Sequence, residues 1–277
     1  MFKEVILFFA IWLLLWSPIA FVLGQRLQWA FPHPPTPEQK IPLVLSLYAL
    51  APPLLWVWAR RSGQSLADFG WSWSPGFGFQ VAAGLGLAIS SLVLLWGLER
   101  LGGWIRFAFD REMLRRQTGS ILLILLIAIA ISAVEELLFR GFLTEALLSI
   151  LGQVQGVDNR PLGSGWVVIL AVGLANGVFA LLHLPWDRWQ NVVPQLPGLW
   201  LMGWVLSLAC LQQGNLGLAI GLHGGWVWAI ASLDTLQALK YTGQVPTWVT
   251  GVGGHVLAGI IGLVFLVAMG GFLWFAA

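Results

Sequence analysis

The sequence predicts an all-α, multi-pass membrane protein: a transmembrane helical bundle of about eight spans. Of its 277 residues, 58% are hydrophobic and only 9% are charged, whereas about 25% of an ordinary soluble domain is charged. Its apolar runs approach or reach the roughly 20 residues that a helix needs to cross a bilayer. Because backbone groups in lipid must be hydrogen-bonded within their own segment, these runs are expected to be helical. Residues 1–277 are therefore predicted to form a single integral membrane domain.

The predicted spans follow from the apolar runs taken in order. They cover residues 5–23, 41–59, 79–98, 120–151, 166–184, 198–211, 215–233 and 255–275. The first is interpreted as a retained anchor rather than a signal peptide, because no small-residue cleavage site follows it. In the third, Gly84 and Gly86 are predicted to let a neighbouring helix approach closely. Residues 152–165 are predicted to form a polar loop.

The connector 99–119 is basic and aromatic, with five arginines interleaved with Trp104, Phe107 and Phe109. This pattern favours an amphipathic helix on an anionic membrane surface, with a solvated loop as the alternative. The formal net charge of +2 does not support nucleic-acid binding. A single cysteine, Cys210, excludes an internal disulfide and a Cys-x-x-Cys metal site. The partners predicted are membrane lipid and a hydrophobic substrate, with no nucleic acid.

Three charged residues end the fourth apolar run. Between Ile121 and Val134 only Ser132 is polar, and Glu135, Glu136 and Arg140 follow with no turn residue between. A charge at membrane depth costs about 3 kcal/mol and persists when it is paired or used. Glu136 and Arg140 stand four residues apart and are predicted to pair. Glu135 lies about 100° further round the helix, so it is the candidate functional carboxylate.

Two later spans carry His183 and His223, the first together with Asn176. Either histidine alone could be satisfied by an interhelical hydrogen bond, but one glutamate and two histidines on three helices indicate a shared polar site. A carboxylate can act as a general base, and imidazoles can orient water or hold a metal. Neither the H-E-x-x-H nor the G-x-S-x-G pattern is present. A proton-coupled transporter would also bury such residues, but it usually shows an internal repeat, and we find none.

Two motifs carry a resemblance to a known family. Residues 135–140 match E-E-x-x-x-R, and Phe179 and His183 match F-x-x-x-H. Both resemble the motifs of the CPBP family, which comprises the type II CAAX prenyl proteases and the Abi group of bacteriocin-processing or self-immunity proteins. The resemblance covers residues 120–233. Within the family, the sequence is similar to cyanobacterial members. The resemblance implies an intramembrane endopeptidase, in a bacterial plasma membrane or a thylakoid, that cleaves a hydrophobic or prenylated protein.

The resemblance also implies roles for individual residues. Glu135 is expected to be the base, His183 the partner of the water or of a metal, and His223 the oxyanion donor, with Glu136, Arg140 and Phe179 in support. The family's third motif, H-x-x-x-N, is not matched, because Val227 stands at its polar position. The candidate second oxyanion donors are Trp226, Trp228 and Asn176. The missing residue also leaves open a non-proteolytic membrane scaffold or assembly factor derived from the same family.

Metal dependence is a separate question. Glu135, His183 and His223 together are the ligand set of several catalytic zinc sites, as in a metalloprotease. A metal-bound histidine normally donates its other N–H to a carboxylate or carbonyl. The neighbouring acid of the same motif, Glu136, is already assigned to Arg140. Metal-free hydrolysis is therefore favoured, with zinc as the alternative.

Overall fold

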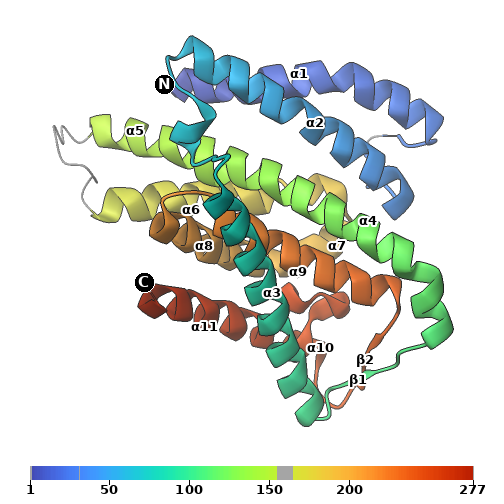
Figure 1. Ribbon diagram of the computed structural model, residues 1–277. Helices are drawn as coiled ribbons and strands as arrows, with labels where there is room; N and C mark the ends of the chain where they lie inside the picture. The colour runs from blue at the N-terminus through green and yellow to red at the C-terminus, as the bar shows by residue number, and fades with distance from the viewer. Residues whose placement is uncertain (1, 31, 155–164, 277) are drawn as a thin grey trace.

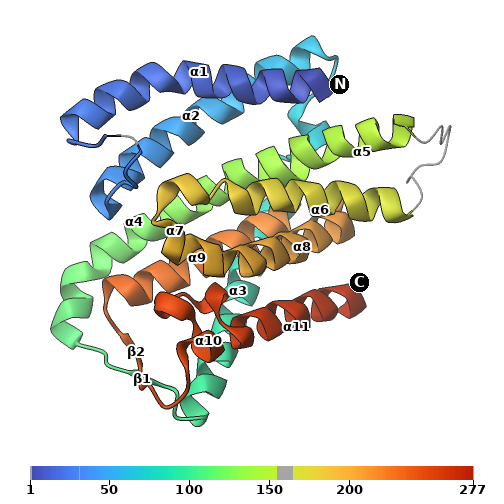
Figure 2. The same cartoon turned by 180° about the vertical axis from the view of Figure 1, so that it is seen from behind.

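The structure is a computed structural model that describes residues 2–30, 32–154 and 165–276. Its main elements are α1 (Phe2–Arg26), α2 (Pro37–Arg61), η1 (Leu66–Phe69), α3 (Pro75–Leu101), β1 (Ile105–Phe107), α4 (Arg111–Glu136), η2 (Leu137–Leu143), α5 (Thr144–Val154), α6 (Gly165–Leu181), α7 (Trp189–Val192), α8 (Leu196–Gln213), α9 (Gly217–Thr235), β2 (Leu239–Tyr241), α10 (Thr247–Thr250) and α11 (Ile260–Ala276). The helices lie in layers, with the α1–α2 pair at one side of the bundle and α11 at the other (Figures 1 and 2).

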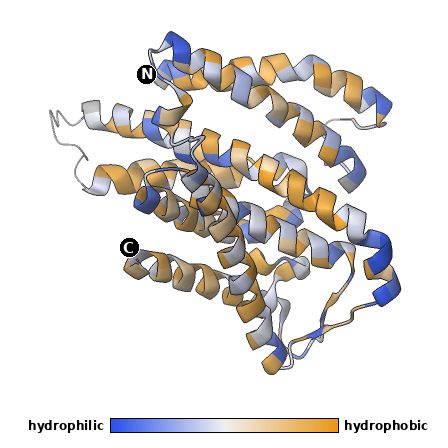
Figure 3. Ribbon diagram, viewed as in Figure 1, coloured by the Kyte–Doolittle hydropathy of each residue, from blue (hydrophilic) through white to orange (hydrophobic). Residues whose placement is uncertain are grey.

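The predicted all-α membrane fold class is confirmed, although two of the eight predicted spans, 215–233 and 255–275, are not among the helices long and apolar enough to cross a membrane. Within the described residues, six helical runs are long and apolar enough to cross a membrane. The helix α11 is apolar but shorter. The helix α9 packs against α3, α4 and α8 and buries much of its length, so it lies inside the bundle. Figure 3 shows apolar residues along most helices, with hydrophilic residues gathered near helix ends and connectors.

Two glycines bring α3 and α9 into backbone contact. A Cβ atom on Gly84 would lie 2.3 Å from the carbonyl oxygen of Leu218, and one on Gly221 would lie 2.1 Å from that of Val81. Only glycine permits so close a crossing. The predicted close approach is confirmed at Gly84, whereas a Cβ on Gly86 would meet no described atom within 4 Å. This crossing fixes the position of α9, which carries His223.

The predicted surface helix in the 99–119 connector is wrong. The middle of that connector is the strand β1, which pairs antiparallel with β2, while α3 and α4 take its two ends. Gly103, at φ +76°, turns the chain after α3. Ile105 is then buried and Arg106 exposed, an alternation typical of a strand. The predicted loop 152–165 lies largely outside the described residues.

Candidate active site

The two glutamates lie where the backbone of α4 changes its hydrogen-bonding pattern. Glu135 and Glu136 are the last residues of α4, and the next seven residues form the π-helical η2. Every residue of η2 is buried, and Gly141 lets the backbone of η1 come close, because a Cβ there would lie 2.5 Å from the oxygen of Phe69. Such π-helical segments occur frequently at functional sites.

Glu136 joins two partners. Its Oε1 accepts from Nη1 of Arg140 at 3.0 Å and lies 2.8 Å from Nδ1 of His223. The side chains of Glu136 and Arg140 are 0% and 1% exposed. The predicted pairing of Glu136 with Arg140 is confirmed. The contact with His223 spans 87 residues, so helical spacing could not reveal it.

Glu135 has a different environment. Its Oε1 accepts a hydrogen bond from the hydroxyl of Tyr48, on α2. Its Oε2 lies 3.5 Å from Nε2 of His223. Sequence reasoning missed Tyr48. One signal could have indicated it, since it is one of only two tyrosines in the chain and lies inside an apolar span, where a buried hydroxyl needs a partner.

His183 lies in the turn that follows α6, beyond the helical end of the predicted span 166–184. Its Nδ1 lies 2.9 Å from the carbonyl oxygen of Phe179, and because a carbonyl only accepts, Nδ1 carries the hydrogen and Nε2 is the acceptor nitrogen. The ring of Phe179 contacts both imidazoles edge to face, with centroids 4.9 Å from His183 and 6.0 Å from His223. The guanidinium of Arg140 lies 4.4 Å above the same ring, a cation–π geometry. Phe179 therefore connects the acidic motif with both histidines.

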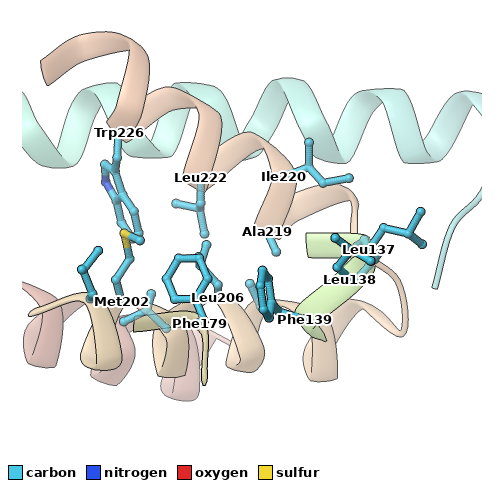
Figure 4. Close-up of a cluster of buried hydrophobic side chains, with 14 of the residues drawn as sticks. Leu137, Leu138, Phe139, Phe179, Met202, Leu206, Ala219, Ile220, Leu222 and Trp226 are labelled. Atoms are coloured by element: carbon cyan, nitrogen blue, oxygen red, sulfur yellow. The ribbon is translucent and has the colours of Figure 1, made fainter. Parts of the chain in front are cut away.

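His183 and His223 line one cavity of about 350 Å³. Its walls are mostly apolar and come from α3, α8, α9 and the segment leading into α11, with Lys40 and Asp187 among its polar members. Buried side chains from η2, α6, α8 and α9, among them Phe139 and Phe179, pack together in an apolar cluster (Figure 4). A cavity of this size, mostly apolar with a few converging polar groups, is typical of a ligand site.

The three candidate second oxyanion donors have other partners. Nε1 of Trp226 donates to Oγ of Ser91 at 3.1 Å, and Nε1 of Trp228 donates to the carbonyl oxygen of Ile121 at 3.0 Å. Nδ2 of Asn176 donates to Oγ of Ser207, on α8, at 3.4 Å. The structure therefore uses these N–H groups to join helices. Val227 itself lines the cavity.

The donor set was also tested against zinc. Within the described residues, no three or more His, Cys, Asp or Glu side chains are grouped so that they could hold a metal ion, and the geometry does not fit a three-ligand site. The sequence argument that second-shell partners are scarce is wrong, because Nδ1 of His223 faces Glu136 and Nδ1 of His183 faces a carbonyl.

Fold and site together define an integral membrane protein with a buried carboxylate–histidine centre. Residues 117–229 match the family described as Type II CAAX prenyl endopeptidase Rce1-like. Searches among curated proteins and among solved structures returned no match. The segment that is similar to this family, residues 117–229, contains Glu135, His183 and His223.

Proposed function

We propose that the protein is an intramembrane endopeptidase that hydrolyses a peptide bond in a hydrophobic or lipidated substrate, using water activated by Glu135. The observation that carries the proposal is that His183 and His223 line one mostly apolar cavity, while Oε2 of Glu135 lies 3.5 Å from Nε2 of His223. The family of the domain supports the same reaction class.

The proposed reaction assigns one task to each side chain. Nε2 of His183 accepts a hydrogen bond from the water, and Glu135 takes a proton from it as general base. The water oxygen bonds to the carbonyl carbon of the substrate, and the carbonyl oxygen becomes an oxyanion that accepts from Nε2–H of His223. Glu135 then gives the proton to the leaving nitrogen as the C–N bond breaks.

The surroundings of His223 support its role as a donor. Both of its ring nitrogens face carboxylates, Nδ1 that of Glu136 and Nε2 that of Glu135. An imidazole donates from both nitrogens only when it is doubly protonated. In the proposed reaction Nε2 of His223 carries a hydrogen, which places an N–H beside the base.

The cavity suggests the kind of substrate. Its lining is mostly apolar, with residues such as Leu199, Met202 and Phe265, so a hydrophobic peptide or an isoprenoid chain would be desolvated there at little cost. Surrounding membrane lipid would give such substrates lateral access.

The test uses purified protein in detergent with two peptides of one sequence, one prenylated on a cysteine and one not. Mass spectrometry is expected to find a new carboxyl terminus on the prenylated peptide. Cleavage of both peptides would indicate that the polypeptide itself is recognised. The second candidate function, a membrane scaffold, is favoured by the apolar Val227 in the cavity. It predicts that neither of these peptides nor an apolar transmembrane peptide is cleaved.

A further inference from the structure

The geometry points to a catalytic role for the α1–α2 hairpin, which lies outside the segment that matches the family: Tyr48 is a positioning residue for Glu135. This inference rests on the proposed function, because it assigns to Tyr48 the orientation of the general base. The family match begins at residue 117, so residues 117–229 alone do not supply this contact.

The two carboxylate oxygens of Glu135 have different neighbours. The hydroxyl of Tyr48 donates to Oε1, while Oε2 lies beside Nε2 of His223. The terminal torsion of a glutamate is broad and roughly two-fold, so without a donor on one oxygen the carboxylate plane can turn. With Oε1 held by Tyr48, Oε2 is the oxygen left to receive the proton of the water. Misplacement of a reacting group by about 1 Å can cost about 100-fold in rate.

Tyr48 is itself held by α1. The indole of Trp12 stacks on its ring, with centroids 6.2 Å apart and planes 17° from parallel. Nε1 of Trp12 donates to the carbonyl oxygen of Leu47 at 2.8 Å, and Trp12 is buried. The helix α2 also packs against α4, which carries Glu135. The hairpin therefore presents Tyr48 to the base from a fixed position.

The hairpin also offers a matched control. Nε1 of Trp16 donates to Oγ of Ser46 at 3.0 Å, which is again a hydrogen bond between α1 and α2. No hydrogen bond joins this described pair to Glu135. Ser46→Ala, like Tyr48→Phe, removes one hydroxyl group from the hairpin. The hydroxyl of Ser46, however, is not hydrogen-bonded to Glu135.

The first test compares Tyr48→Phe with Ser46→Ala in steady-state cleavage. Tyr48→Phe is expected to lower kcat by up to about 100-fold, the cost of misplacing a reacting group by about 1 Å, with KM unchanged. Ser46→Ala is expected to leave both constants unchanged. A purely structural role for the hydroxyl would not separate kcat from KM. An unchanged kcat for Tyr48→Phe, or an equal loss in both variants, overturns the inference.

The second test needs no cleavage and separates this inference from the proposed function. Thermal stability is measured for wild type, Tyr48→Phe, Glu135→Leu and the double variant. If the two side chains interact, the loss caused by Tyr48→Phe should disappear in the Glu135→Leu background. Additive effects overturn the inference. Absence of cleavage by the wild-type protein would instead count against the proposed function, and this cycle would still decide whether Tyr48 and Glu135 are coupled.

Discussion

Replacing Glu136 by Gln should destabilise the protein strongly. The Glu136–Arg140 pair is nearly inaccessible to solvent, at 0% and 1% exposure. Nε and Nη2 of Arg140 have no described hydrogen-bond partner, so Glu136 is the acceptor that compensates this buried charge. Removing one member of a buried ion pair costs about 3–5 kcal/mol. Because Gln keeps an oxygen at this position, we expect a value near the lower end, about 3 kcal/mol.

The same helix supplies the control. Glu112 and Arg116 in α4 have the same i,i+4 spacing and the same 3.0 Å contact, but their side chains are 61% and 73% exposed. Such a surface pair contributes at most about 0.5 kcal/mol. Glu112→Gln should therefore leave the unfolding temperature almost unchanged, while Glu136→Gln should lower it by about 6–12 °C, since 1 kcal/mol corresponds to about 2–4 °C in a protein of this size class.

The assay is thermal unfolding of both variants and wild type in one detergent. Adding Arg140→Met to Glu136→Gln should recover part of the loss, because no uncompensated charge then remains buried. Equal stability of the two single variants would refute the reasoning, since it would mean that Glu136 is not the counter-ion of a buried arginine.

Further expectations concern helix contacts and metal. Gly221→Ala should lower stability and cleavage, because its Cβ would lie 2.1 Å from the oxygen of Val81, whereas Gly86→Ala, with open space around it, should match wild type; equal effects on unfolding temperature would contradict this. Asn176→Ala should lower stability by about 1–3 kcal/mol, because Ser207 loses its partner, and leave kcat unchanged; a loss of kcat at full stability would place Asn176 in the reaction. Chelator treatment should leave peptide cleavage unchanged, and loss of cleavage that zinc restores would contradict metal-free hydrolysis.

The local part of the site could be predicted from the sequence. Helical spacing alone paired Glu136 with Arg140 and set Glu135 apart from them, because both relations lie within one helical turn. The all-α membrane fold followed in the same way from apolar length and composition. These features depend on residues close together in the sequence and on the length of the apolar runs. Both can be read directly from the sequence.

Features that depend on distant segments could not be predicted. The contacts of Glu135 with Tyr48 and of Glu136 with His223 each join residues 87 positions apart. The strand β1 forms because β2 pairs with it, and a basic, aromatic connector does not reveal that partner. The hydrogen bond from the indole of Trp226 to Ser91 joins residues 135 positions apart. In each case the decisive partner is set by the packing of the bundle.

The central claim is that Glu135 is the base, and the most direct test is cleavage by Glu135→Gln. Gln keeps an oxygen that can accept from Tyr48 but cannot take a proton from water. We predict that kcat falls by about 100-fold or more, the contribution expected of a general base, while the unfolding temperature stays close to wild type. Cleavage at the wild-type rate by Glu135→Gln would contradict the account.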